Sequence, residues 1–279
     1  MRIRYGSRIL ASLVVFALSP ILLAQAPLRQ AQGGEQSRTA AQPGVAADPG
    51  KPDFSGVWER PGVIGVSPTG PGAIRNADLR SGRLSWQAFS MEEPPMQPWA
   101  ASRYREARAG LGSDIYQSGR DELDPVFSCF PPGLPRIYTV PRPFEIQQFP
   151  DVMLMLFEAD HWVRRIYTDG REHPDGYLVT WMGHAIGKWD GDALVVDTVN
   201  INEKTWLDAL GHPKSDALHV VERFRRPNQN TLEIDFTFDD PKAYTRPWTG
   251  KKVFVLGPPG HEVLEDIVCN DLLELGKHR

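Results

Sequence analysis

The chain of 279 residues lacks the short motifs of several large enzyme classes. It has no G-x-S-x-G nucleophile elbow, no Walker phosphate loop, no G-x-G-x-x-G dinucleotide fingerprint and no H-E-x-x-H zinc motif. These motifs carry serine-triad hydrolysis, binding of nucleoside triphosphates or dinucleotides, and zinc-dependent proteolysis. We therefore expect none of these activities, and no cofactor, from this sequence.

Cysteine is also scarce, with only Cys129 and Cys269 in the chain. Zinc ligation by cysteine would need CxxC pairs or histidines at ligand spacing, and neither residue has such neighbours. An even pair far apart in sequence is typical of a disulfide in a protein that folds in an oxidising compartment. We expect a Cys129–Cys269 disulfide and no bound metal.

An excess of charge of one sign is absent as well. The chain has 31 Lys and Arg against 35 Asp and Glu, a net charge of −4 at pH 7. Without a basic stripe it is poorly suited to nucleic acid or anionic lipid, so neither partner is expected. Beyond the N-terminal segment no apolar run reaches the roughly 20 residues of a membrane-spanning helix. The oligomeric state is not indicated.

The N-terminus has the order of charged, apolar and small residues that is typical of a secretory signal peptide. Residues 1–8 carry three arginines and no acid, residues 9–24 are mostly apolar, and Ala24 and Ala26 suit a cleavage site. An uncleaved membrane anchor is the alternative, but the run is short and Pro20 lies near its end. We predict a signal peptide over residues 1–26, with Ala24 as the alternative cut, and a periplasmic or secreted bacterial protein.

The rest of the chain divides by composition. Residues 27–52 contain almost no large apolar side chain and cannot bury enough surface to fold, so we predict a disordered tether. Residues 53–279 then form a single β domain. Within it, residues 61–132 are an irregular excursion rich in Pro and Gly, interrupted by one short helix over residues 98–110.

Short apolar runs separated by turn residues follow from residue 141 onward. This spacing, with no intervening helices, predicts an antiparallel barrel or sandwich. A first strand with Gly56-x-Trp58 resembles the lipocalin-like (calycin) β-barrels, in which the tryptophan plugs one end. The predicted strands cover residues 54–58, 144–149, 152–159, 162–168, 177–182, 185–189, 193–199, 217–225, 231–238 and 251–256.

One strand carries an acid where its pattern requires an apolar residue. Leu218, Val220 and Phe224 alternate along one face of residues 218–225, and Glu222 lies on that same face. A buried carboxylate is costly unless it is paired, and its pKa tends to rise, which suits a general acid or base. The structural alternative is an ion pair with an arginine such as Arg165.

Other candidate catalytic side chains lie near this acid in the predicted fold. His173, His184 and Asp197 could join Glu222 in a His/carboxylate site, although Asp197 could equally be a solvent-facing strand residue. His212 and His219 are weaker candidates. The candidate ligand-binding residues are two arginines and three aromatic side chains that could line a cavity: Arg165, Arg223, Trp181, Tyr167 and Trp248.

A series of short blocks also resembles a large uncharacterised family of exported bacterial proteins. Together the blocks span nearly everything after the tether, and the resemblance implies an exported, barrel-shaped protein without implying a reaction. Ala185 stands where the family pattern suggests a serine after Gly183-His184, which argues against a catalytic serine there. The matching blocks are residues 53–58, 124–125, 129–136, 143–146, 165–171, 173–174, 183–187, 189–192, 195–198, 222–223, 239–241 and Trp248.

Three functions remain open at this point. The first is an exported β-barrel that binds a small amphipathic or aromatic molecule and could transform it by cofactor-free acid/base chemistry of the lyase or hydratase type. The second is a non-catalytic interaction protein of the cell envelope that uses the excursion at residues 61–132. The third is a metal-dependent hydrolase. The sequence does not decide whether the protein is an enzyme.

Overall fold

The computed structural model describes residues 50–61, 86–111 and 124–265. The predicted signal peptide, most of the tether and parts of the excursion lie outside these ranges, as does Cys269. The Cys129–Cys269 disulfide therefore stays a prediction.

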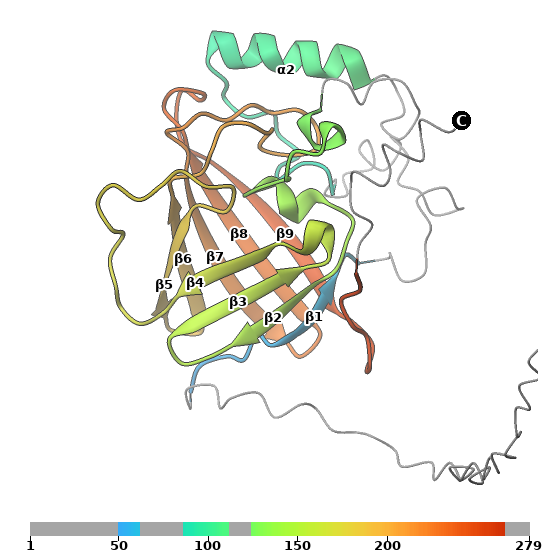
Figure 1. The fold of residues 1–279 in the computed structure, drawn as a ribbon, viewed down its shortest axis with the longest axis vertical. Coiled ribbons are helices and arrows are strands. Elements are labelled where there is room, and N and C mark those ends of the chain that lie inside the picture. The colour runs from blue at the N-terminus through green and yellow to red at the C-terminus, as the bar shows by residue number, and fades with distance from the viewer. Residues whose placement is uncertain (1–49, 62–85, 112–123, 266–279) are drawn as a thin grey trace, which may run out of the picture. The chain divides into compact units, whose positions relative to one another are not determined.

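The described strands close into one barrel in chain order, with β1 paired to β9 (Figure 1). This confirms the predicted mainly β, lipocalin-like barrel and favours it over an open sandwich. The strands are β1 (Gly56–Glu59), β2 (Phe144–Gln148), β3 (Val152–Phe157), β4 (Val163–Tyr167), β5 (His184–Asp190), β6 (Ala193–Val199), β7 (His219–Asn228), β8 (Thr231–Asp239) and β9 (Trp248–Leu256). The described residues also include the short 3-10 helices η2 (Pro125–Ser128), η3 (Arg136–Thr139) and η4 (Ala159–His161).

One strand pair departs from the antiparallel expectation. β4 and β5 run parallel and meet over only Ile166↔Ala185 and Tyr167↔Ile186. Parallel strands cannot be joined by a tight hairpin, and here residues 168–183 form a connection that projects outward beside β5 (Figure 1). The strand predicted at residues 177–182 lies in this connection and is wrong, because β4 and β6 already occupy both edges of β5. A single bridge, Thr180↔Ile201, remains.

The barrel interior is filled by aromatic side chains. Tyr138, delivered by η3, lies with its ring centroid 5.3–6.2 Å from those of Phe144, Phe157, Phe236 and Phe254. Phe144 and Phe254 are also in edge contact, at 4.8 Å. All five side chains are at most 3% exposed. The interior is thus a packed core, stabilised by burial of apolar area and by edge-to-face ring contacts.

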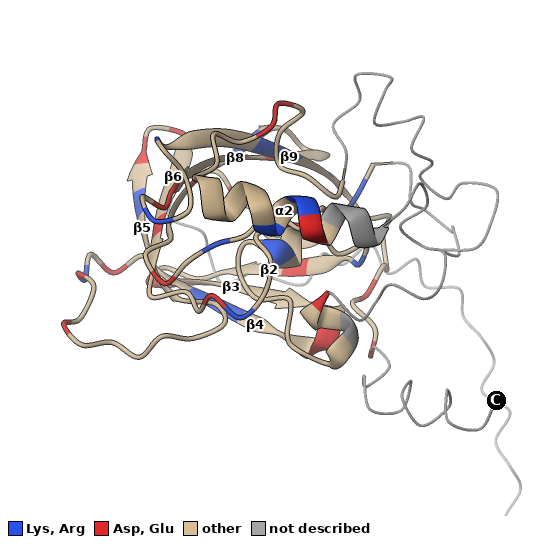
Figure 2. Ribbon diagram, turned by 90° about the horizontal axis from the view of Figure 1, so that it is seen from above, with Lys and Arg blue, Asp and Glu red and all other residues tan. Residues whose placement is uncertain are grey.

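The predicted helix is confirmed as α2 (Pro98–Leu111), which lies across one end of the barrel in both views (Figures 1 and 2). It begins with Pro98, which suits the first helical turn because its missing N–H would lack a partner there anyway. Trp99 Nε1 donates to the carbonyl of Lys242 at 2.7 Å, and the Tyr104 ring stacks on His212 at 4.2 Å. These contacts fix the helix over the barrel end.

The tryptophan of the Gly-x-Trp pattern is fully buried, as expected for a barrel plug. The indole of Trp58 donates to the carbonyl of Phe54 at 2.8 Å, and the guanidinium of Arg226 lies 5.0 Å from the ring centroid. Gly56 has φ +134°, and a Cβ there would lie 2.7 Å from Leu256 Cδ1 on the neighbouring strand. Glycine is favoured here by the positive φ, since the Leu256 side-chain end could shift to admit a Cβ.

Candidate functional site

Four polar side chains from separate segments meet outside the packed core. We call His173, His184, Asp197 and His219 the histidine cluster. His173 comes from the 168–183 connection, His184 begins β5, Asp197 lies on β6 and His219 begins β7. Asp197 points outward because its neighbours on the strand point inward, and side chains of a strand alternate between its two faces. The sheet thus presents the cluster on the face opposite the core.

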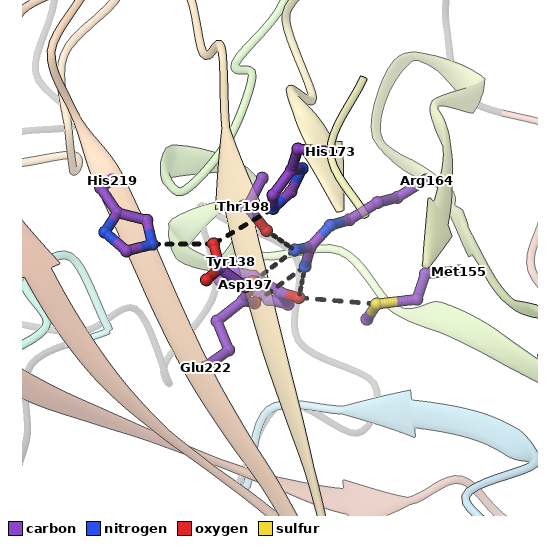
Figure 3. Close-up of polar contacts among 8 residues, drawn as sticks. All are labelled: Tyr138, Met155, Arg164, His173, Asp197, Thr198, His219 and Glu222. Atoms are coloured by element: carbon purple, nitrogen blue, oxygen red, sulfur yellow. Dashed lines mark hydrogen bonds and ion pairs between the residues drawn. The ribbon is translucent and has the colours of Figure 1, made fainter. Parts of the chain in front are cut away.

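A continuous hydrogen-bonded chain joins the four residues. His184 Nδ1 lies 2.8 Å from His173 Nδ1, and His173 Nε2 lies 3.3 Å from Asp197 Oδ1. The same Asp197 oxygen lies 2.7 Å from His219 Nε2 (Figure 3). The sequence therefore predicted three members of a real cluster, and it ranked the fourth, His219, too low.

The direction of these hydrogen bonds determines which ring nitrogen of each histidine carries the proton. Asp197, as a carboxylate, can only accept, so His219 and His173 each donate from Nε2–H. The Nδ1 of a neutral His173 is then an acceptor and takes the Nδ1–H of His184. His184 is left with a lone pair on Nε2. No hydrogen bond joins that atom to a described residue, and it is not among the fully buried side-chain atoms that lack a partner, while His184 as a whole is 5% exposed.

The charges of the cluster push its pKa values in different directions. Burial lowers the pKa of His184, assisted by His173 and Arg171, whereas the hydrogen bond to Asp197 raises the pKa of His219. The hydrogen bond from His219 in turn lowers the pKa of Asp197. The raised pKa of His219 favours the fold below its unfolded value of about 6.5, and this gain is lost as pH rises through the folded pKa. The lowered pKa of His184 acts oppositely and favours the fold above about 6.5.

Aromatic rings enclose His184 on two sides. The Tyr167 ring stacks on the imidazole with centroids 5.6 Å apart, and the Tyr177 ring meets it edge-on at 4.7 Å. Arg171 covers Tyr167, with its guanidinium carbon 3.7 Å from the ring centroid, and pairs with Asp169 through Nε at 2.9 Å. Tyr167, a predicted ligand-binding residue, therefore lies at the cluster.

Glu222 lies on the other side of the sheet. It points into the barrel as the alternation predicted, is 0% exposed, and forms an ion pair with Arg164. Arg164 Nη1 contacts Glu222 Oε1 at 2.8 Å and the Tyr138 hydroxyl at 2.6 Å, and Nη2 donates to Thr198 Oγ1 at 2.9 Å (Figure 3). Burial, the largest single influence, lowers the pKa of Arg164, but the charges and hydrogen bonds of Glu222 and Tyr138 together more than offset it, so the pKa is raised.

These contacts separate Glu222 from the predicted catalytic group. Val196, not Asp197, is the residue paired with Glu222 across β6 and β7, so the two acids lie on opposite faces. Glu222 is a structural ion-pair partner, as the alternative had it, with Arg164 in the place suggested for Arg165. Arg165 itself is exposed on the outer face of β4.

The remaining predicted residues lie apart from the cluster contacts. Arg223 pairs with Asp190 at 2.7 Å on the surface, and Trp248 packs against Phe238 in the core at 4.4 Å. Trp181 is in edge contact with Phe130 at 5.9 Å. His212 lies beneath α2, and its Nδ1 is 2.6 Å from Oδ2 of Asp208.

A small cavity lies beside Trp189 of β5 and Leu194 of β6. It has a volume of about 10 Å³, room for about one water molecule, and no histidine lines it. Its lining includes Gln148, Met153, Thr168, Trp189 and Leu194. It is too small for an organic ligand.

Over residues 50–61, 86–111 and 124–265, no three or more His, Cys, Asp or Glu side chains are arranged to hold a metal ion. In the same part of the chain, no helix combines the length and apolar character needed to cross a membrane.

Sequence reasoning missed the two groups that define the interior polar network, Arg164 and Tyr138. Tyr138 lies in a 3-10 turn, where no period marks an inward side chain. His219 could have been predicted from the sequence, because an antiparallel pairing of β6 with β7 brings outward residues near Asp197 and near His219 together.

Comparison of the chain with family models finds no match, and comparison with curated proteins finds none either.

Proposed function

We propose that this exported barrel protein binds a small organic molecule at the histidine cluster and withdraws a proton from it through His184. The observation that carries the proposal is the hydrogen-bonded chain from Asp197 through His173, which leaves Nε2 of His184 as an open acceptor. Glu222, in contrast, is fully buried and already paired with Arg164, whose Nη1 lies 2.8 Å from Oε1, which favours the outer cluster as the binding site.

The electrostatics of the cluster suit acid/base chemistry. A base is most effective when it is neutral before it takes the proton, and the lowered pKa of His184 keeps it so. The imidazolium that forms faces the negative charge of Asp197 through His173, which stabilises it in the way a buried acid supports a catalytic histidine. His219, with a raised pKa, is the candidate proton donor. No cofactor is needed for this step.

An interaction protein is the second candidate, and one observation favours it. Tyr177, Leu178 and Val179 are three consecutive apolar residues with exposed fractions of 39%, 79% and 55%. Such a run on the surface is unusual unless it contacts something. Tyr177 of this run contacts the His184 ring at the start of β5, so the proposed ligand site and the proposed partner surface adjoin each other.

A fragment screen on two variants tests the proposal. We expect small molecules that bind the wild-type chain, detected by ligand-observed NMR, to bind His184→Asn about tenfold more weakly, since one hydrogen bond to Nε2 is lost. The Asn side-chain amide can still donate to His173 in place of Nδ1–H, so the rest of the chain of hydrogen bonds is kept.

The control is His161→Asn, an exposed histidine with positive φ, a conformation that asparagine tolerates. This variant should bind every fragment as the wild type does. A screen without a single ligand, or ligands held equally well by His184→Asn, would contradict the proposal.

A further inference from the structure

We infer that the ligand of the histidine cluster is a phenol, an aromatic ring that presents a neutral hydroxyl to Nε2 of His184. The inference rests on the proposed function and names the chemical class that the surroundings of His184 select. Two features select it: the bare lone pair on Nε2 and the aromatic and apolar side chains beside it.

The lone pair on Nε2 of His184 determines which polar group the ligand should carry. A lone pair attracts a hydrogen-bond donor and repels an anion. A carboxylic acid, with a pKa of about 4, has lost its proton at neutral pH, whereas a phenol with a pKa of about 10 keeps it. The nearest guanidinium does not reverse this preference, because Arg171 is already paired with Asp169 through Nε, 2.9 Å from Oδ1 and 3.0 Å from Oδ2.

The side chains around His184 favour a ligand with an aromatic ring. The Tyr167 and Tyr177 rings both contact the imidazole, and the Arg171 guanidinium carbon lies 3.7 Å from the Tyr167 ring centroid, which holds that ring in place. Beyond them Leu178 and Val179 expose apolar surface that a flat ring could cover. Aromatic rings gain from stacked and edge contacts with other rings, which an aliphatic alcohol cannot make. The site therefore favours a phenol over an alcohol of similar size.

The chemical step is balanced without any further reagent. The phenol O–H bond breaks, its electron pair stays on the oxygen, and the proton forms the Nε2–H bond of His184. The products are a phenolate and an imidazolium whose Nδ1–H points to His173, with the charge of Asp197 beyond it. Bound phenol should therefore ionise at a lower pH than free phenol.

Three matched probes test the inference on the full chain by ¹⁹F NMR: 4-fluorophenol, 4-fluoroanisole and 4-fluorobenzoate. We expect 4-fluorophenol to bind roughly tenfold more tightly than the anisole, which lacks the donor, and more tightly than the anionic benzoate. His184→Asn should reduce phenol binding to the level of the anisole, and His161→Asn should leave it unchanged. Should His184→Asn not fold, the ¹⁵N shift of His184 Nε2 in the wild-type chain must still move on adding the phenol.

The outcomes separate the inference from the proposed function. Equal binding of phenol and anisole, or tightest binding of the benzoate, overturns the phenol inference. If those probes fail while other fragments bind in a His184-dependent way, the inference falls and the proposed function stands. If no ligand depends on His184, both fall.

Discussion

Replacement of Glu222 by Gln is expected to lower the free energy of unfolding by about 3–5 kcal/mol, because it leaves the buried guanidinium of Arg164 without a counter-charge. The neutral amide can keep one hydrogen bond, but among the described residues the other hydrogen-bond partners of Arg164 are the uncharged hydroxyls of Tyr138 and Thr198. The measurement is unfolding in urea or guanidinium chloride, with the midpoint and slope compared between variants.

The neighbouring arginine supplies the control. Arg165 is the arginine next to Arg164 on β4, but it lies on the exposed face. Arg165→Gln should therefore shift the free energy of unfolding by no more than about 0.5 kcal/mol. Arg164→Met combined with Glu222→Leu should be less damaging than Glu222→Gln alone, since no lone charge remains in the core. A Glu222→Gln variant as stable as Arg165→Gln would show that the ion pair is not the structural centre described.

The second large effect is expected at Gly183, which precedes His184. Its φ is +67°, and a Cβ there would lie 2.5 Å from the carbonyl oxygen of Val199 and 2.8 Å from Thr198 Cγ2. Gly183→Ala therefore combines backbone strain with a clash against the backbone of β6, and we expect a loss of about 3 kcal/mol. Because the clash pushes the start of β5 away from β6, ligand binding at His184 should be lost as well.

Gly176 gives a matched control for this variant. It has the same φ of +67° in the same connection, but nothing lies within 4 Å of an added Cβ. Gly176→Ala should therefore cost only about 1 kcal/mol, the strain alone. Denaturant unfolding of both variants separates strain from clash, and equal losses would contradict the close approach of Gly183 to β6.

How far the sequence predicts this structure depends on the periodicity of each segment. The inward position of Glu222 follows from strict alternation with Val220 and Phe224. The identity of its partner does not follow, because both faces of β4 carry apolar residues: Ile166 accompanies Arg164, while Val163 and Tyr167 accompany Arg165. With no clean face, the pattern could not choose between adjacent arginines.

The histidine cluster was predictable in part for a different reason. His184 on β5 and Asp197 on β6 lie on strands that are consecutive in the chain and pair with each other, so their proximity follows from a local sequence pattern. His173 comes from a long connection whose path depends on the parallel β4–β5 pair, which no turn motif in the sequence indicates. The same connection contains residues 177–182, whose apolar run predicts a strand; instead residues 177–179 are exposed, and Tyr177 contacts His184.

Two embedded carboxylates therefore have different roles because of one physical rule. Glu222 and Asp197 lie on adjacent strands, but alternation turns one into the core and the other outward. In the core a carboxylate requires an immobile counter-charge, which makes it structural. On the outer face Asp197 is shared by two imidazoles, which makes it the residue that fixes their tautomers.

Histidine-selective ¹⁵N NMR of the full chain tests this ordering of protons most directly, by long-range ¹H–¹⁵N correlation above pH 7. We predict opposite neutral tautomers in two neighbouring rings, with the proton of His173 on Nε2 and that of His184 on Nδ1. Asp197→Asn should erase this preference in both rings. A proton found on Nε2 of His184 in the wild-type chain would mean that the site has no base to offer, and would contradict the account.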